Sequence, residues 1–264
     1  YFLIDNGFYE VVNSPFVKAA SDNAISIDNP LDSNRKHLRL NIVDSLVDNL
    51  IYNENRQKDS IKLFEISDIY RFENGLSKKR MISIVASGRL GLNYEDFSKK
   101  INLEYLTKLM KEIMPNRTFN IKNFPRDSLD TKSKSEIITL EFDIESASED
   151  IVNVKTTAKP PREFNKYNTI SEYPSSFKDI SFLVGDSSKM EKLQSILLNY
   201  KSEIVKQIFI FDYYYNEKSD NMKIGFRFIF QSNSQTLTSE MIDAVYEDII
   251  NKSLNIGGIS IPGL

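Results

Sequence analysis

Hydrophobic residues recur at two different periods along the first 150 positions, which predicts a mixture of helices and strands. Apolar residues three and four apart predict amphipathic helices over 42–51 and 97–113, the second ending near Pro115. Apolar and β-branched stretches at 8–17, 61–72, 81–86 and 137–144 are typical of strands. The apolar start at 1–4 fits the end of a helix, and the polar, basic stretch 31–41 predicts a loop.

Residues 155–171 show no periodicity and contain Lys159-Pro160-Pro161-Arg162. Proline cannot continue a helix and cannot donate to a sheet, so this stretch predicts a boundary between domains. We therefore expect a first domain over 1–158, a linker over 159–170 and a second domain over 171–264.

The second domain carries six predicted elements in the order βαββαβ. The strands are expected at 178–184, 204–214, 222–231 and 259–261, and the helices at 189–200 and 239–254. Ser188 with Glu191 three residues later predicts a capping box, and Thr238 is the expected N-cap of the last helix. This order is that of the ferredoxin-like split βαβ fold, with both helices on one side of a four-stranded sheet. The other face of such a sheet is open, and several folds bind single-stranded RNA there.

Alternation along two neighbouring strands predicts which residues point to that open face. Phenylalanines at 226, 228 and 230, with Ile224, suit the helix-side core, which leaves Gly225, Arg227, Ile229 and Gln231 on the open face. On the preceding strand Ile208 and Ile210 suit the core, so Phe209, Phe211 and Tyr213 are expected opposite. Asp212 interrupts the alternation, as a solvated group near a turn or as an acceptor for a base edge.

Composition and charge limit the chemistry that this chain can carry. It has 264 residues, 41% apolar and 27% charged, with no cysteine, one histidine (His37) and a net charge of −3. The absence of cysteine excludes disulfides and thiolate sites and fits the cytoplasm, and no apolar run is long enough to span a membrane. The negative charge predicts no strong general attraction to nucleic acid. The first residue is Tyr1 and not methionine, so we expect a piece of a longer protein.

Common enzyme signatures are missing. The sequence contains no phosphate-binding loop, no dinucleotide fingerprint, no nucleophile elbow and no zinc-protease motif. Glu65 and Asp68 lie three apart on a predicted strand and face opposite sides, which argues against a catalytic pair. A strand–loop–helix–strand unit with Arg39, Arg56 and Glu65 is either an ordinary fold element with surface charges or a structural motif that holds a partner subunit or ligand. We expect no catalytic residue and no metal site.

Motifs across nearly the whole chain resemble those of one family. Asn29-Pro30, Leu38-Arg39-Leu40, Asn53-Glu54-Asn55-Arg56 and Leu63-Phe64-Glu65-Ile66 follow the order N-P, M-R-T-S-L, N-x-N-R and L-F-E-I-G. Later stretches match better: Tyr173-Pro174 with Lys178-Asp179-Ile180, then 210–214, 226–231 and 236–238 resemble F-P-x-x-x-R-D-L, L-F-D-V-Y, F-R-L-T-F-Q and T-L-T. In this respect the chain resembles the C-terminal part of the β subunit of bacterial phenylalanine–tRNA ligase.

The resemblance implies an α+β chain: a class II synthetase-like antiparallel sheet domain without catalysis, then a ferredoxin-like anticodon-binding domain. It implies a chain that supports a catalytic α subunit in an α2β2 heterotetramer and binds the anticodon region of tRNA-Phe. The whole ligase would use ATP and magnesium, with no cofactor in this part. Carried over by motif, the residues expected at the RNA are Asp179, Phe211, Asp212 and Tyr214, with Arg227 beside them. Gln235 departs from the family's usual arginine, and 125–135 is shorter than the family's hairpin.

The charge divides unevenly between the two predicted domains. Residues 171–264 hold nine lysines and arginines against twelve acids, so the whole net charge of −3 lies in the proposed RNA-binding domain. Recognition there should depend on stacking and base-edge contacts. The acidic charge also leaves open a ferredoxin-like module that binds a small molecule or a protein. An independent hydrolase is disfavoured, because no nucleophile–base pair is recognisable.

Overall fold

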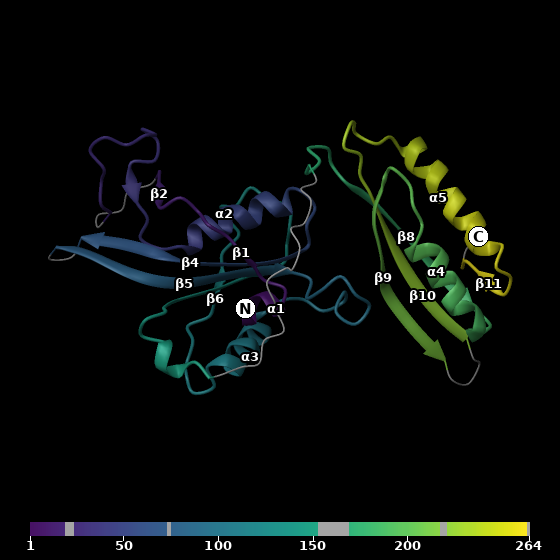
Figure 1. Cartoon of the computed structure of the whole chain (residues 1–264), viewed down its shortest axis with the longest axis horizontal. Coiled ribbons are helices and arrows are strands. Elements are labelled where there is room, and N and C mark those ends of the chain that lie inside the picture. The colour runs from purple at the N-terminus through teal and green to yellow at the C-terminus, as the bar shows by residue number, and fades with distance from the viewer. Residues whose placement is uncertain (19–23, 73–74, 153–168, 217–220, 263–264) are drawn as a thin grey trace. The chain divides into compact units, whose positions relative to one another are not determined.

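A computed structural model describes residues 1–18, 24–72, 75–152, 169–216 and 221–262. The chain divides into two units, Tyr1–Gly88 with Lys100–Arg162 and Arg89–Lys99 with Glu163–Leu264 (Figure 1). Most of the predicted linker, residues 159–168, lies outside the described residues. No helix in the described part of the chain is both long and apolar enough to cross a bilayer.

The first unit is built around a five-stranded sheet in the order β1-β4-β5-β7-β6. Its strands are β1 (Tyr9–Glu10), β4 (Ser60–Phe72), β5 (Leu76–Gly88), β6 (Lys122–Phe124) and β7 (Ile137–Asp143). All neighbouring strands are antiparallel except β1 and β4, which run parallel. Figure 1 shows β4 and β5 as one long hairpin.

Helix α2 (Val43–Glu54) covers one face of this sheet. Leu46, Val47 and Leu50 pack there against Leu63 and Val85. The helix is held at its start from both sides: Asn41 and Asp44 exchange two hydrogen bonds of 2.8 and 2.9 Å, and Glu141 on β7 accepts from the Ile42 N–H at 2.8 Å. These bonds satisfy amides that a helix start otherwise leaves unpaired.

Two expectations for the first unit are wrong. The apolar stretch 8–17 is not one strand, because Asn13-Ser14-Pro15 interrupts it, leaving β1 and the short β2 (Phe16–Val17). Within the expected loop 31–41, His37–Leu38 forms β3, which pairs with β2. The remaining elements are α1 (Phe2–Asp5), α3 (Leu103–Ile113) and the 3₁₀ turn η1 (Ser148–Asp150).

Helix α3 begins six residues later than its hydrophobic pattern suggested. The Asn102 side chain accepts a hydrogen bond from the Tyr105 N–H at 2.8 Å, and this cap sets the helix start at Leu103. Phe97 and Ile101 are buried all the same, outside the helix. The helical spacing of apolar residues therefore extends to residues that precede the first residue of the helix.

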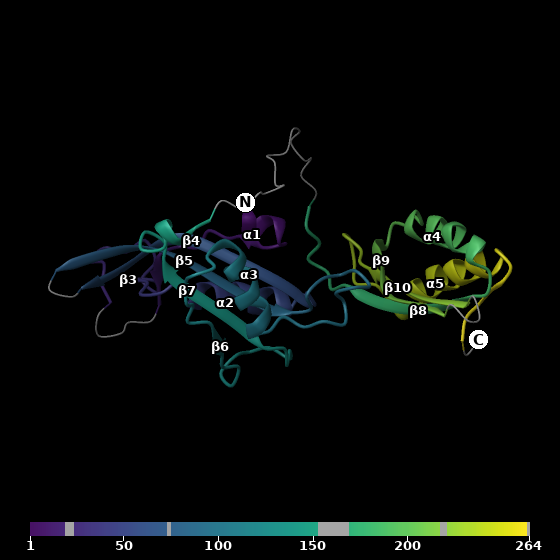
Figure 2. The same cartoon turned by 90° about the horizontal axis from the view of Figure 1, so that it is seen from below.

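The second unit has the predicted βαββαβ order. The strands β8 (Ser176–Val184), β9 (Val205–Asn216), β10 (Asn221–Phe230) and β11 (Ile259–Ser260) form a sheet in the order β11-β8-β10-β9, with every pair antiparallel. Both helices, α4 (Met190–Leu198) and α5 (Ser239–Leu254), lie on the same side of it (Figure 2).

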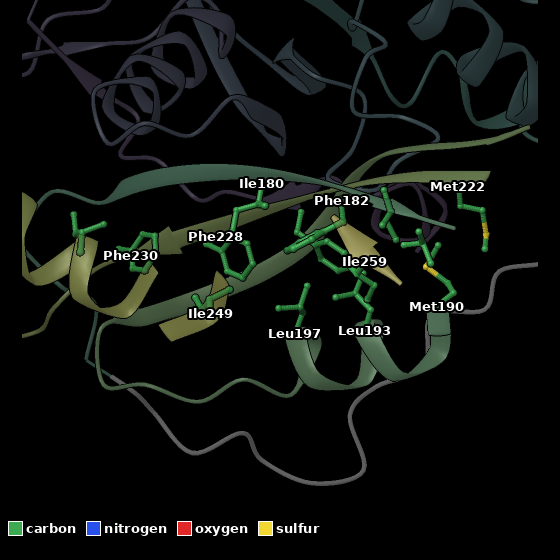
Figure 3. Close-up of a cluster of buried hydrophobic side chains, with 14 residues drawn as sticks. Ile180, Phe182, Met190, Leu193, Leu197, Met222, Phe228, Phe230, Ile249 and Ile259 are labelled. Carbon is green, nitrogen blue, oxygen red and sulfur yellow. The ribbon is translucent and has the colours of Figure 1, made fainter. Parts of the chain in front are cut away.

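Phenylalanines fill the space between this sheet and its helices. Phe182, Phe226, Phe228 and Phe230 are fully buried and pack with Leu193, Leu197 and Ile249 from the helices (Figure 3). Each buried side chain of this size contributes about 1.5–3 kcal/mol of transfer free energy. The period-two assignment of the core face of β10 is thus confirmed.

One of the two predicted helix caps of this unit is confirmed. The Thr238 hydroxyl accepts from the Met241 N–H at 3.4 Å at the start of α5. The capping box at Ser188 is wrong, because Asp186 accepts from the Ser188 N–H at 2.9 Å instead. A 3₁₀ turn, η2 (Ser187–Lys189), follows that cap and leads into α4.

Candidate nucleic-acid interface

The sheet face turned away from α4 and α5 is called the open face here. Its positions follow from the register with β10, whose Gly225, Arg227 and Ile229 alternate with buried phenylalanines. Arg227 lies opposite Asp179 on β8 and Phe209 on β9. Phe177 lies opposite Ile229, and Asp212 lies opposite Gly225.

A β-bulge in β9 brings the expected binding residues onto this face. The partner of Phe226 is Ile210, but the partner of Gly225 is Asp212, so Phe211 is an extra residue in the strand. The extra residue resets the alternation and places Asp212 and Tyr214 on the open face, in register with Gly225 and Lys223. All five residues predicted at the RNA therefore share one face, although strict alternation would have separated them.

The same bulge corrects one expectation. Tyr213 was expected on the open face, but it pairs with the buried Ile224, and its hydroxyl lies 3.6 Å from Sδ of the buried Met222. The register thus assigns the Tyr213 backbone position to the helix side, although its ring centre also lies 5.6 Å from that of Tyr94, in the segment that contains Phe97. Phe209 and Phe211, before and within the bulge, stay on the open face as expected.

Gly225 is needed for the bulge to close as it does. A Cβ atom at this position would lie 2.8 Å from Cζ of Phe211 and 3.1 Å from Cβ of Asp212. Real Cβ contacts are essentially never as short as the first distance, so the Phe211 ring can lie on the backbone only because residue 225 has no side chain. Glycine inside a strand commonly marks such a bulge or close approach.

Asp179 and Arg227 form a two-pronged ion pair across β8 and β10. Nε and Nη2 of Arg227 each donate to one carboxylate oxygen of Asp179 at 2.7 Å. The Tyr246 hydroxyl on α5 donates to the backbone carbonyl of Asp179 at 3.0 Å and ties this part of β8 to the helix layer. Forked pairs are both stronger and more directional than single-contact pairs.

Aromatic rings surround the Arg227 guanidinium within this unit. Its carbon lies 4.1 Å from the ring centre of Phe177, 4.8 Å from that of Phe97 and 5.7 Å from that of Phe211. Phe97 also contacts the rings of Phe209 and Phe211, so it covers the middle of the open face. Phe177 and Tyr214 remain 55% and 59% exposed on either side of this covered centre.

The charges of the open face largely neutralise one another. Besides the Asp179–Arg227 pair, Lys223 Nζ lies 3.7 Å from Asp212 Oδ2, with both side chains nearly half exposed. A neutral face with exposed rings suits base stacking and base-edge hydrogen bonds better than attraction of phosphates.

Of the three residues predicted as a motif in the first unit, the structure joins two. Arg39 Nη2 lies 2.9 Å from Glu65 Oε1, and both side chains are only 2% exposed. Asn13 donates to the other Glu65 oxygen at 2.8 Å, and Arg39 Nε donates to the Asp68 backbone carbonyl at 3.3 Å. Arg56 is not part of this group: its guanidinium stacks on Tyr52 at 3.4 Å, exposed to solvent.

A cavity of about 600 Å³ lies above α2, next to the buried Arg39. Asp44 and Asp48 line it from the helix, with Lys18 and Arg35 among the other lining residues. Burial is the main cause that raises the pKa of Asp48, with the nearby Asp44 charge adding to it. Within the described ranges, no group of three or more acidic or histidine side chains could hold a metal ion.

Sequence reasoning did not single out Phe177 or Lys223. Their positions were available from the pattern, since Phe177 lies two residues before Asp179 and Lys223 two before Gly225 on the same strands. Period two places each on the face of its neighbour. The role of Phe97 could not be found in this way, because it lies about eighty residues before the sheet.

Comparisons with known proteins match two parts of the chain to two family models. The family model "Ferredoxin-fold anticodon binding domain" matches residues 171–259, and "Phenylalanyl tRNA synthetase beta chain CLM domain" matches residues 1–143. The two matches give the class of protein: an aminoacyl-tRNA synthetase chain with a ferredoxin-fold anticodon-binding domain.

The curated relatives are phenylalanine–tRNA ligase beta subunits. That of Francisella tularensis is 24% identical, covering 95% of this chain and 35% of the relative. That of Buchnera aphidicola subsp. Acyrthosiphon pisum is 26% identical, covering 94% of this chain and 35% of the relative. The chloroplastic one of Pyropia yezoensis is 23% identical, covering 95% of this chain and 40% of the relative. A solved pyrrolysyl-tRNA synthetase of Desulfitobacterium hafniense is 17% identical, covering 55% of this chain and 63% of that one. Its TM-score of 0.38 is too low to carry an argument.

The chain belongs to the phenylalanyl-tRNA synthetase beta chain family. It spans about a third of the length of the first two of these relatives, at 35% of each. The resemblance read from the motifs is thereby confirmed at the level of the family and of the anticodon-binding domain.

Proposed function

We propose that this chain binds the anticodon region of tRNA-Phe through the open face of its second unit. The residues that act are Asp179, Phe211, Asp212, Tyr214 and Arg227. The observation that carries the proposal is the bulge at Phe211, which puts Asp212 and Tyr214 on the same sheet face as Asp179 and Arg227. Tyr214 offers a ring for stacking, and Asp212 an acceptor for a base edge.

The forked Asp179–Arg227 pair acts on the protein side of this interface. Both guanidinium nitrogens that face Asp179 donate to it at 2.7 Å, so the pair joins two strands and leaves the neighbouring aromatic rings as the contact surface. The paired charges make binding by this unit alone weak and only modestly dependent on salt. Tight binding then needs the remainder of the ligase.

The first unit, in this proposal, is a class II synthetase-like domain without catalysis that supports the catalytic α subunit in an α2β2 assembly. Its Arg39–Glu65 pair is buried, so in this proposal the pair has a structural role and does not contact a substrate. ATP and magnesium would serve the attachment of phenylalanine in the α subunit, and no step at this chain is routed through them. The protein would act in the cytoplasm.

A binding titration with the assembled ligase tests the RNA claim. We expect tRNA-Phe to bind more tightly than a tRNA-Phe with an altered anticodon, and Asp212→Ala to reduce this preference about tenfold, as one base contact is worth roughly 1–3 kcal/mol. Lys192→Ala, an exposed position on α4 and therefore on the other side of the sheet, is the control and should leave the preference unchanged. Equal binding of both tRNAs by the wild type would refute the proposal.

A further inference from the structure

Phe177 is exposed in a way that the fold does not require. Its ring is 55% exposed on β8, whereas Phe182 on the same strand and the three phenylalanines of β10 are fully buried. Contiguous apolar surface commonly marks a contact site, and Phe177 shares the surroundings of Arg227 with the rings of Phe97 and Phe211.

The ring is also held in place from behind. The Arg227 guanidinium carbon lies 4.1 Å from its centre, in stacking range, and Asp179 fixes that guanidinium by two bonds of 2.7 Å. A cation over one side of a ring is attracted by its π electrons. The arrangement orients Phe177 before any ligand arrives, while more than half of the residue remains exposed.

We propose that Phe177 is a stacking residue for an unpaired nucleobase of the bound tRNA. This rests on the proposed function and adds a contact to it. Every base has a π face, so the stack selects unpaired bases and tolerates any of the four. Since the charge behind the ring is already neutralised by Asp179, the contact adds little salt dependence.

The base on Phe177 is a different one from the base on Tyr214. Phe177 is in register with Ile229 and Tyr214 with Lys223, six residues apart on β10. At about 3.4 Å per residue this separates the two rings by roughly 20 Å along the strand. Phe97 covers the surface between them. One base cannot span that distance, so two separate nucleotides are stacked.

The test uses Phe177→Leu, Phe177→Trp and Tyr214→Ala in the assembled ligase, with tRNA-Phe carrying a single abasic nucleotide at each anticodon-loop position in turn. Phe177→Leu keeps apolar bulk but loses the π face, so we expect about fivefold weaker binding or more. Phe177→Trp should stay within twofold of the wild type. Leu198→Ala, an exposed apolar residue on the helix side, is the matched control and should bind like the wild type.

The abasic series separates stacking from a merely structural role. At one nucleotide, removal of the base should weaken tRNA binding by the wild type but should not weaken binding by Phe177→Leu any further. This nucleotide should differ from the one whose removal has no further effect on Tyr214→Ala. Wild-type affinity of Phe177→Leu, or equal weakening at all positions, would overturn the inference while Tyr214→Ala and Asp212→Ala still support the proposed function. If Phe177→Leu, Tyr214→Ala and Asp212→Ala all bind like the wild type, both this inference and the proposed function are refuted.

Discussion

Removing the charge of Glu65 should destabilise the first unit severely, because it leaves Arg39 buried without a counter-charge. The two side chains lie 2.9 Å apart and are each 2% exposed, so water cannot replace the lost partner. Breaking a buried pair in this way costs about 3–5 kcal/mol. Arg39 Nε keeps its bond to the Asp68 carbonyl, which places Glu65→Gln near the lower end, about 3 kcal/mol.

Urea unfolding followed by circular dichroism measures this loss. With a denaturant dependence of about 2 kcal/mol per molar urea, the midpoint of the first unit should fall by roughly 1.5 M. The transition of the second unit should not move and serves as the internal control. Lys252→Met, which breaks the exposed pair with Asp248, should change stability by well under 1 kcal/mol.

The double variant Arg39→Met with Glu65→Leu decides whether the pair itself is responsible. Replacing both charges by apolar groups of similar size is often neutral or stabilising, so most of the lost stability should return. A midpoint shift below about 0.5 M for Glu65→Gln, or a double variant as unstable as the sum of the single variants, would refute the reasoning.

Two further predictions concern the second unit. Gly225→Ala should displace the Phe211 ring, because its Cζ would lie 2.8 Å from the new methyl group. We expect a loss of about 1–3 kcal/mol of stability in thermal unfolding, together with weaker tRNA binding. Unchanged tRNA binding would contradict the role of the bulge. Burial, followed by the hydrogen bond and charge of Asp248, raises the pKa of Tyr200 to about 12, so the stability from this group is complete below pH 10 and is lost between pH 10 and 12. A titration of phenol absorbance against Tyr200→Phe should show this late ionisation, and Asp248→Asn should shift it downward; ionisation of Tyr200 near pH 10 in the wild type would contradict it.

The architecture of the second unit was predictable because local signals agreed with one another. The buried phenylalanines of β10 alternate without interruption, and Thr238 caps α5 as its sequence indicates. In the first unit, helix α3 shows where such signals stop: the apolar period ran on to Phe97, but the cap at Asn102 set the start of the helix. The hydrophobic period indicates which side chains are buried, whereas the capping residue indicates where the helix begins.

The candidate site was predictable only in part. Period two placed Arg227 on the open face, but it could not place Asp212 and Tyr214 there, because a bulge changes the alternation without changing composition. Gly225 was the available signal. Arg39 and Glu65 lie 26 positions apart in sequence, and their pairing follows from the packing of β4 against the preceding loop, which no local pattern shows.

Footprinting of tRNA-Phe in the assembled ligase tests the central claim most directly. We expect the anticodon loop to be protected from hydroxyl radicals in the wild-type complex, and this protection to decrease in Asp212→Ala and Tyr214→Ala while contacts elsewhere on the tRNA persist. An anticodon loop as reactive in the wild-type complex as in free tRNA would contradict recognition by the open face.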